Sequence, residues 1–312
     1  MTQRRLSVQE KEECYSLYSS GKHTFKSLGD NYGVSATAIK GLMNRRGLRS
    51  PPQSELQRKY HFNERWLDVI GEQQAYFIGL MYADGYNNTD RNTAVLSLKE
   101  SDKHILNDIS NLFSLKRPLQ FVRLSPPNSN QYRLNLQSKI VTDRLDTLGC
   151  HKAKTYTLEF PDWLNKEMAP HFIRGYIDGD GWIGVTRFSL VGTEKFCGAI
   201  SAIAKDMFDI NTYTSTRHKE RANNIREVEF SGLNKCIKFL SWIYKDASIY
   251  LDRKHDRYLA MINRKRLQDT PRICSITNCT KKHVGRGYCK NHFYEFCGGA
   301  EKRRARYITS LN

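Results

Sequence analysis

The sequence predicts an α+β fold built from a duplicated unit. Between about residues 67 and 265, amphipathic helical stretches alternate with short strand-like runs. Two matching segments, residues 77–85 (FIGLMYADG) and 173–181 (IRGYIDGDG), place Asp84 and Asp180 in the same G-x-x-x-[A/G]-D-G setting. In both halves a strand candidate containing Ser-Leu follows the motif, and an amphipathic helix comes next. A repeat of this size indicates two copies of one unit rather than a solenoid.

Four runs rich in β-branched and aromatic residues predict strands of this repeated core. They are residues 94–99, 132–137, 155–160 and 227–232. The first amphipathic helix of each half is expected at residues 102–113 and 194–208. A second strand and helix follow in both halves, and each half closes on a segment that carries a lysine.

The charge balance predicts a polyanionic partner. The chain has 50 lysines and arginines against 32 aspartates and glutamates, which gives a net charge of +18. Such an excess favours nucleic acid or an anionic membrane surface. A membrane is not expected, because no stretch approaches about 20 apolar residues and the N-terminal residues are polar. We therefore expect an intracellular, cytoplasmic protein, from a bacterium, a phage-infected cell or an organelle. The alternative is a basic surface that serves solubility alone.

The two motifs predict helices that pack unusually close together. Each has small residues four positions apart, where a glycine inside a helix costs roughly 1 kcal/mol unless close contact compensates. These pairs are Gly79 with Ala83 and Gly175 with Gly179. The glycine that ends each motif suits a C-terminal cap with positive φ. These are Gly85 and Gly181.

This geometry places Asp84 and Asp180 side by side at the C-terminal ends of two helices. A carboxylate there opposes the helix dipole at a cost of about 0.3–1 kcal/mol, and two close carboxylates raise each other's pKa. A divalent cation relieves both penalties, and paired oxygen ligands suit Mg²⁺ in phosphodiester hydrolysis. The alternative for either motif alone is an ordinary Asp-Gly turn after a helix.

The paired motifs resemble those of the LAGLIDADG homing endonucleases, in the single-chain form with two motifs. The likeness covers about residues 68–265. It implies two pseudo-symmetric αββαββα halves (68–165 and 166–266), each with a saddle-shaped antiparallel sheet facing the DNA major groove. It implies that Asp84 and Asp180 bind the catalytic Mg²⁺ or Mn²⁺. It also implies a monomer that hydrolyses both strands of a specific double-stranded DNA site across the minor groove.

The sequence departs from the family pattern at two positions, Tyr82 and Arg174. Tyr82 stands where many members have an aspartate, whereas the second motif keeps Asp178. This position is not the metal-binding one in the family, so activity is not put in doubt. Arg174 replaces a small residue, and we expect its side chain to point away from the contact between the two motif helices.

The resemblance also implies a basic residue near each active centre. Lys154 and Lys254 occupy the lysine-bearing segments that close the two halves, and a lysine beside the scissile phosphate can stabilise developing negative charge. The alternative is a phosphate contact or a solvated side chain. Base and phosphate contacts are expected from polar strands at residues 120–137, 186–190 and 212–219, including Arg187 and Arg217. Such strands could equally be the polar face of any half-exposed sheet.

Residues 1–50 predict a separate helical module, followed by a linker over residues 51–67. Ser35 is a plausible N-cap for a third helix, whose apolar face comprises Ile39, Leu42 and Met43. Helix, glycine-containing turn and basic helix form a helix-turn-helix pattern that binds DNA. The expected DNA contacts are Lys40, Asn44, Arg45 and Arg46. The alternative is a small helical hairpin with no role in DNA binding.

The last segment, residues 270–312, predicts a zinc-binding basic tail. Two ligand pairs at Cys-x4-Cys and Cys-x2-His spacing can reach one tetrahedral Zn²⁺. They are Cys274, Cys279, Cys289 and His292, with His283 and Cys297 as spare candidates. The string resembles small zinc-binding tails beside phage-type nucleases. The alternative is a reduced, partly disordered tail. A basic run follows, comprising Lys302, Arg303, Arg304 and Arg306. The other four cysteines are expected to be buried thiols.

Together these features predict a free-standing homing endonuclease of an intron or other mobile element, and no intein is expected. Two other functions remain open at the level of sequence. One is an RNA maturase on the same scaffold, which can keep both acids. The other is a non-catalytic DNA-binding transcriptional regulator, although such proteins tend to lose the metal-binding acids that this chain retains.

Overall fold

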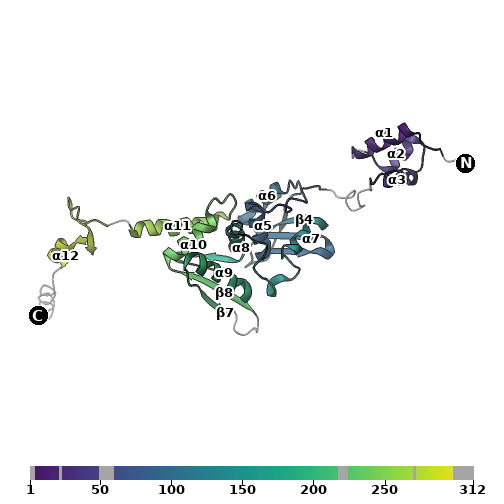
Figure 1. The fold of residues 1–312 in the computed structure, drawn as a ribbon. Coiled ribbons are helices and arrows are strands. Elements are labelled where there is room, and N and C mark those ends of the chain that lie inside the picture. The colour runs from purple at the N-terminus through teal and green to yellow at the C-terminus, as the bar shows by residue number, and fades with distance from the viewer. Residues whose placement is uncertain (1–3, 21–22, 49–59, 217–223, 270–271, 298–312) are drawn as a thin grey trace. The chain divides into compact units, whose positions relative to one another are not determined.

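The computed structural model describes residues 4–20, 23–48, 60–216, 224–269 and 272–297. The chain divides into two compact units, Met1–His61 and Phe62–Asn312. Figure 1 shows the course of the chain through both. No helix of the described ranges is both long and apolar enough to cross a membrane.

The N-terminal unit contains helices α1 (Val8–Ser19), α2 (Phe25–Tyr32) and α3 (Ala36–Arg45). Ser35 caps α3 as predicted, since its hydroxyl accepts from the Ala38 N–H at 3.1 Å. Gly33 has φ +64°, which permits the tight turn between α2 and α3. The unit has a small core of its own, comprising Cys14, Leu28, Ile39, Leu42 and Met43.

The second unit contains two copies of the same element order, αββαββα, which confirms the predicted fold class. The first copy comprises α5 (Glu72–Ala83), β1 (Gly85–Asn88), β2 (Thr93–Lys99), α6 (Lys103–Leu112), β3 (Gln120–Val122), β4 (Gln131–Gln137) and α7 (Lys139–Thr147). The second comprises α8 (Ala169–Asp180), β5 (Gly181–Ile183), β6 (Arg187–Thr193), α9 (Glu194–Phe208), β7 (Tyr213–Thr216), β8 (Ile225–Ser231) and α10 (Leu233–Tyr244).

Each copy forms one four-stranded antiparallel sheet, and the two sheets have matching topology. The strand orders are β1-β2-β4-β3 and β5-β6-β8-β7. The registers also correspond, because Gly85 pairs with Leu96 and Gly181 pairs with Leu190. The duplication seen in the sequence is therefore a duplication of the sheet itself.

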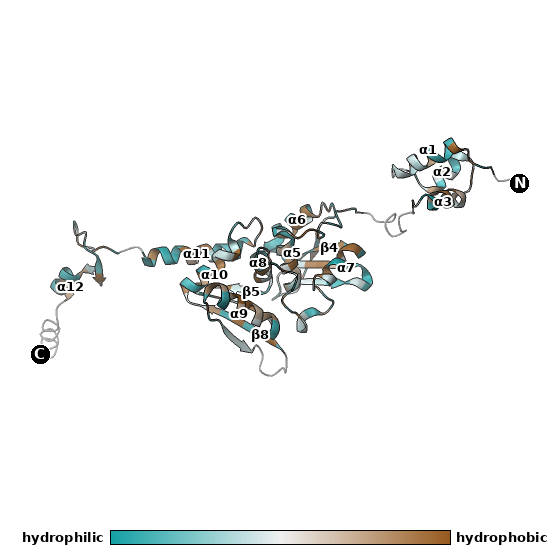
Figure 2. Ribbon diagram, in the orientation of Figure 1, coloured by the Kyte–Doolittle hydropathy of each residue, from teal (hydrophilic) through white to brown (hydrophobic). Residues whose placement is uncertain are grey.

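Alternating burial along the strands shows how each sheet is anchored. In β2 the buried residues are Ala94, Leu96 and Leu98, and their neighbours in the strand are more exposed. Side chains alternate between the faces of a sheet, so one face packs on the helices and the other is left polar. Figure 2 shows the same mixing of hydrophobic and hydrophilic residues along the helices and strands of this unit.

The strand predicted at residues 155–160 is wrong. Residues Lys154–Tyr156 form a short 3₁₀ helix, and none of the described strands includes residues 157–160. The carbonyl of Leu158 accepts from the hydroxyl of Thr193. Leu158 is buried in the connection between the two halves. Neither of the two four-stranded sheets includes this segment.

The core begins a few residues before the first predicted half. The Asn63 N–H donates to the carbonyl of Phe113 at 2.7 Å, and the Phe62 and Phe113 rings lie 6.1 Å apart. Leu67 is fully buried. The four scattered cysteines are buried free thiols, as predicted: Cys14, Cys150, Cys197 and Cys236.

An 18-residue helix, α11 (Asp252–Asp269), follows the second copy. The last described elements are β9 (His283–Gly285), β10 (Tyr288–Cys289) and α12 (Lys290–Cys297). Strands β9 and β10 form a two-stranded antiparallel sheet. The basic run at residues 302–306 lies outside the described residues.

Candidate active site

The motif helices α5 and α8 lie in direct backbone contact, as the small residues predict. A Cβ on Gly79 would lie 2.1 Å from the carbonyl oxygen of Phe172. A Cβ on Gly175 would lie 2.0 Å from that of Tyr76. Both distances are far inside van der Waals contact, so these glycines permit the close approach of the two helices.

Asp84 and Asp180 come together at the C-terminal ends of these helices. Asp84 caps α5 and Asp180 is the last residue of α8. Asp84 reaches toward the other helix, because a Cβ on Gly179 would lie 3.1 Å from its Oδ2. Both aspartates are exposed, whereas residues 75–82 and 172–178 of the two helices are buried. The pair therefore lies at the exposed end of the close contact between α5 and α8.

Gly181 is the C-cap of α8 as predicted, whereas Asp84 rather than Gly85 caps α5, and neither glycine has the positive φ that was expected. Gly181 has φ −94° and ψ 159°, and each glycine begins a strand directly after the helix. The structure needs glycine for a different reason. A Cβ on Gly85 would lie 2.6 Å from the Met81 carbonyl oxygen, and one on Gly181 would lie 2.5 Å from that of Ile177. The abrupt change from helix to strand folds these residues against the last turn.

The electrostatics of the pair follow from this crowding. Desolvation at the helix ends, followed by the charge of Asp180, raises the pKa of Asp84 to about 6. Lys254, Lys154 and Arg253 act in the opposite direction. Two helix dipoles also direct their negative ends at the same place. The arrangement therefore favours either protonation of Asp84 or a bound cation.

The structure places Lys154 and Lys254 at the ends of the same two helices. Lys254 is buried and donates to the carbonyls of Asp178 at 2.7 Å and Gly179 at 3.3 Å. Lys154 donates to the carbonyl of Gly85. Burial lowers the pKa of Lys254 to about 8 and also lowers that of Lys154. Each lysine thus adds positive charge beside one of the two aspartates.

The residues two positions before the aspartates, Tyr82 and Asp178, have related structural roles. The hydroxyl of Tyr82 donates to the Leu148 carbonyl at 2.7 Å. Asp178 is buried, and its Oδ2 accepts from the Leu251 N–H and from the hydroxyl of Tyr76, both at 2.8 Å. Leu148 and Leu251 precede Lys154 and Lys254 in sequence. The residue two before each aspartate therefore tethers the segment that brings in the lysine.

The expectation that Arg174 points away from the motif-helix contact is wrong. Its side chain is fully buried, and its Nη2 pairs with Glu72 Oε1, on α5, at 2.8 Å. It also donates to the carbonyls of Ile243 at 2.7 Å and Ile249 at 3.0 Å. The motif tolerates an arginine here because α10 and the segment after it supply acceptors for a buried guanidinium.

Sequence reasoning missed two residues beside the site. Arg253 forms an ion pair with Asp102 of the first half, with Nη2 and Oδ2 2.9 Å apart. Trp182 directly follows the Asp-Gly of the second motif and is 51% exposed. The position of Arg253 next to Lys254 and the matching aromatic Tyr86 after the first motif were available signals, but neither indicates which side chains meet in space.

The expected DNA-contacting strands are only partly described. Arg187 lies exposed on β6, where its Nη1 is 3.4 Å from Glu229 Oε2. Arg217 lies outside the described residues. In the N-terminal unit Lys40, Asn44 and Arg45 are exposed on α3, whereas Arg46 pairs with Glu12 and lies 4.1 Å from the Tyr15 ring centroid.

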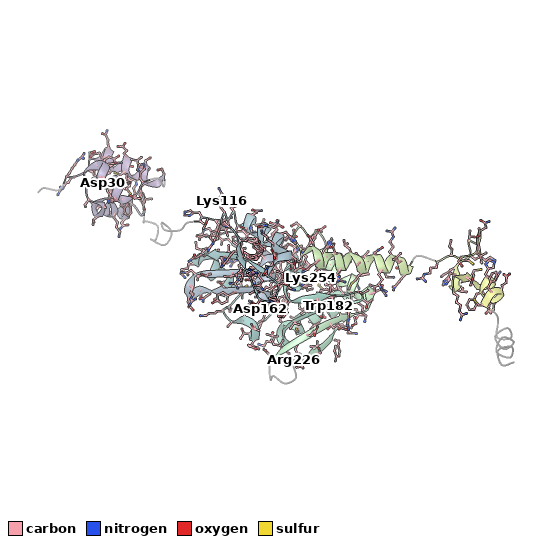
Figure 3. The ribbon with its side chains drawn as sticks, turned by 180° about the vertical axis from the view of Figure 1, so that it is seen from behind. Asp30, Lys116, Asp162, Trp182, Arg226 and Lys254 are labelled. Atoms are coloured by element: carbon pink, nitrogen blue, oxygen red, sulfur yellow. The ribbon has the colours of Figure 1, made fainter. Side chains whose placement is uncertain are left out.

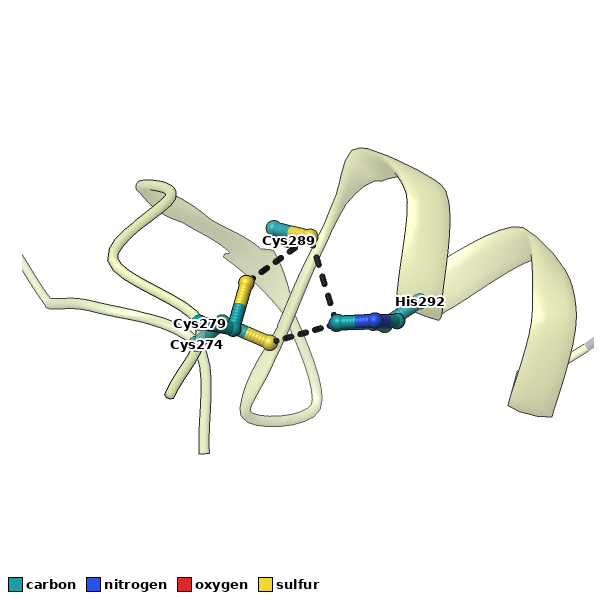
Figure 4. Close-up of side chains that lie close together, drawn as sticks. All are labelled: Cys274, Cys279, Cys289 and His292. Atoms are coloured by element: carbon teal, nitrogen blue, oxygen red, sulfur yellow. Dashed lines mark hydrogen bonds between the residues drawn. The ribbon is translucent and has the colours of Figure 1, made fainter. Parts of the chain in front are cut away.

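The four predicted zinc ligands form one cluster (Figure 4). The Sγ atoms of Cys274, Cys279 and Cys289 and a ring nitrogen of His292 all lie within 4.8 Å of one another. His292 Nδ1 is 3.1 Å from the Cys274 Sγ and 3.6 Å from the Cys289 Sγ. The Sγ atoms of Cys279 and Cys289 are 3.9 Å apart. Thiolates at tetrahedral corners around Zn²⁺ are about 3.8 Å apart, so the set fits that ion. His283 and Cys297 are not in the cluster.

Comparisons with known proteins return matches among solved structures alone. No family model matches the chain, and no curated protein matches it. The chain is similar to the meganuclease I-SmaMI bound to uncleavable DNA, with a TM-score of 0.44 and 8% identity over 64% of this chain and 92% of that one. It is also similar to the LAGLIDADG homing endonuclease I-LtrWI bound to target DNA, with a TM-score of 0.43 and 10% identity over 67% of this chain and 92% of that one. A third similar structure is the N-terminal LAGLIDADG domain of DUF199/WhiA. Its TM-score is 0.40, with 14% identity over 63% of this chain and 93% of that one.

Proposed function

We propose that this chain is a metal-dependent double-strand DNA endonuclease of the LAGLIDADG homing type, acting as a pseudo-symmetric monomer. The observation that carries the proposal is the pairing of Asp84 and Asp180 at the ends of two helices in backbone contact. Each half contributes one carboxylate and one lysine to the pair. A duplicated site with one set of groups in each half suits a substrate with two antiparallel strands.

The donor set fits a divalent cation of the Mg²⁺ or Mn²⁺ kind. Both aspartates are exposed residues, and desolvation followed by repulsion from Asp180 raises the pKa of Asp84. Hard cations prefer such oxygen ligands and leave further positions open for substrate. When bound, the cation would polarise the phosphodiester and activate water. Asp84 and Asp180 are the residues that would hold it.

The lysines have a separate task in this proposal. Backbone carbonyls hold both lysines, that of Gly85 at the start of β1 for Lys154 and that of Asp178 in the last turn of α8 for Lys254. An ammonium fixed beside the scissile phosphate stabilises the negative charge that develops on its oxygens. Because the carbonyls fix the ammonium groups before DNA arrives, little reorganisation is needed during the reaction.

The accessory modules are proposed to add affinity for DNA. The exposed Lys40, Asn44 and Arg45 on α3 suit contacts with a DNA backbone or groove. In the tail, the cluster at Cys274, Cys279, Cys289 and His292 is proposed to bind Zn²⁺ and thereby fold the segment around it. Burial alone would raise the pKa of the Cys274 thiol, but backbone hydrogen bonds with Cys289 and Ile276 lower it to about 6.

The test is to map DNA ends after incubation with a library of long duplexes, with Mg²⁺ or with EDTA. We expect discrete double-strand breaks that require Mg²⁺. Asp84→Asn and Asp180→Asn should each lower cleavage roughly 100-fold or more, because a lost metal ligand removes several kcal/mol of transition-state stabilisation. Asp206→Asn is the matched control, since this exposed aspartate lies on α9, outside the site.

Two outcomes would count against the proposal. One is uncut DNA in Mg²⁺ together with tight binding to structured intron RNA, which would favour a maturase. The other is tight, specific DNA binding with no breaks, which would favour a regulator.

A further inference from the structure

A cationic cavity of about 520 Å³ adjoins the second aspartate. It begins at Gly181, next to Asp180, and is lined by the start of β5, the turn to β6 and the first turns of α11. Its charged lining groups are Arg187, Arg253, Lys254 and Arg257, and its lining includes no carboxylate. Four cations around one cavity repel each other unless an anion occupies it. Figure 3 shows Trp182 and Lys254 in this region of the core.

The cavity also presents an aromatic ring. Trp182 remains 51% exposed although it is the largest side chain of the lining. A Cβ on Gly184 would lie 2.3 Å from its Cη2, so the ring packs directly on that backbone. The Arg187 guanidinium carbon lies 5.6 Å from the ring centroid. The ring is thus held in place by its neighbours while part of its surface stays available.

The cations are not equally engaged. Arg253 pairs with Asp102 and Arg187 lies near Glu229. Within the described ranges no carboxylate pairs with Arg257, which is exposed on α11 one helical turn beyond Arg253. Arg257 therefore has guanidinium donors available to a ligand.

At the matched positions, the described residues of the first half lack the three arginines. Tyr86 follows its Asp-Gly where Trp182 follows the second. Thr93, which begins β2, stands where the sheet register of the second half has Arg187. Arg253 lies one residue before Lys254 and Arg257 three residues after it. At the same spacing from Lys154 the residues are Ala153 and Thr157. Among the described residues of the first half, Lys152 is a cation of this region, but Asp90 pairs with it at 2.8 Å, so the carboxylate-free set of cations belongs to the second half.

We propose that this cavity binds one nucleotide of the DNA strand next to Asp180, with its phosphate on Arg257 and Arg253 and its base or sugar against Trp182. An arginine fork matches a phosphate oxygen pair, and aromatic rings stack on nucleotides in a sequence-tolerant way. The assignment builds on the proposed function and makes the two halves unequal: the second half holds its strand more firmly than the first.

The test uses the full-length protein in EDTA, with tryptophan fluorescence followed during titration with the dinucleotide pdTpdT. Trp182 is the one tryptophan among the described residues that is exposed. We expect quenching by pdTpdT in the wild-type protein and its loss in Trp182→Tyr. Arg257→Ala should weaken binding roughly tenfold, the size expected for a lost charge-assisted hydrogen bond. The control Arg264→Ala removes the same charge from an exposed position two turns along α11 and should change binding less than twofold.

Three results would overturn the assignment. They are no quenching, equal affinity in Arg257→Ala and wild type, or displacement of pdTpdT by inorganic phosphate at equal concentration, which would indicate a phosphate site alone. The proposed function fails separately, if no duplex DNA is cut in Mg²⁺. If DNA is cut, strand-specific labelling should show that Arg257→Ala slows one strand more than the other, while Tyr86→Ala does not reproduce that bias.

Discussion

At the scale of single residues, the two aspartates of the proposed active site are held in an unfavourable environment. Asp84 faces the negative end of a helix dipole, and its pKa is raised to about 6 from 3.8, first by desolvation and then by Asp180. A carboxyl group with a raised pKa in the folded state favours folding while it is protonated. Its ionisation then lowers stability progressively as the pH rises from about 4 through 6.

We therefore expect Asp84→Asn to raise the free energy of unfolding at neutral pH in EDTA by about 0.5–1 kcal/mol, a value reduced for the exposure of the side chain. The gain should shrink as the pH falls from about 6 to about 4 and vanish below about 4, where the wild-type carboxyl is protonated in both states. Thermal unfolding across this pH range measures the difference.

Excess Mg²⁺ provides the control for this experiment, because the cation should stabilise the wild-type protein and leave Asp84→Asn nearly unchanged. An Asp84→Asn variant that is less stable than wild type at pH 7 in EDTA would contradict the electrostatic account of Asp84. Loss of activity with a gain of stability is the usual sign of a site selected for function.

At the scale of elements, the contact between α5 and α8 sets the distance between the two halves of the site. Gly175→Ala would place a methyl group 2.0 Å from the Tyr76 carbonyl oxygen, so the helices must separate. We expect a loss of about 1–3 kcal/mol in the free energy of unfolding. Cleavage should fall as well, because separating the helices moves Asp84 away from Asp180. Chemical denaturation of the variant measures the first effect.

Gly198→Ala is the matched control for the helix contact. Gly198 lies inside α9, and a Cβ there would meet nothing within 4 Å. The same substitution should therefore stabilise the protein by roughly 0.5–1 kcal/mol, through helix propensity alone. If both variants shift stability in the same direction, close helix contact is not the reason for Gly175.

At the scale of the whole molecule, the described chain has more than one independently organised part. The N-terminal unit has its own apolar core, and the duplicated αββαββα unit has another. The tail buries little: α12 has no buried residue, while Cys274 and Cys289 of the cluster are buried. Its fold is therefore expected to depend on a metal rather than on a hydrophobic core.

We expect purified protein to contain one zinc ion per chain, and Cys279→Ser to lose it. Cys297→Ser is the control and should keep zinc, since that thiol lies outside the cluster. Chelation should leave the main thermal transition of the duplicated unit unchanged, because the ligands belong to the tail. Metal analysis and calorimetry together decide the point, and equal zinc contents in the two variants would disprove the ligand set.

The sequence by itself determined the features that depend on local spacing. Helix periodicity placed Asp84 and Asp180 at helix ends, small residues four apart predicted the helix contact, and the Cys-x4-Cys and Cys-x2-His pairs predicted the cluster in the tail. These predictions succeed because backbone geometry fixes which side chains share a helix face or a turn. The strand-like residue pattern at residues 155–160 gave a wrong prediction, because this segment belongs to neither of the two described four-stranded sheets.

Only the tertiary structure decided the features that depend on segments distant in sequence. It gave Gly181 its role through contact with Ile177, buried Arg174 against Glu72, and brought Trp182 together with Arg257 in one cavity. Such contacts depend on the packing of different helices and strands. The neighbouring side chains then determine how buried each residue is and which charges lie near it. The duplication could therefore be predicted from the sequence. The difference between the side chains beside the two aspartates became evident only in the folded structure.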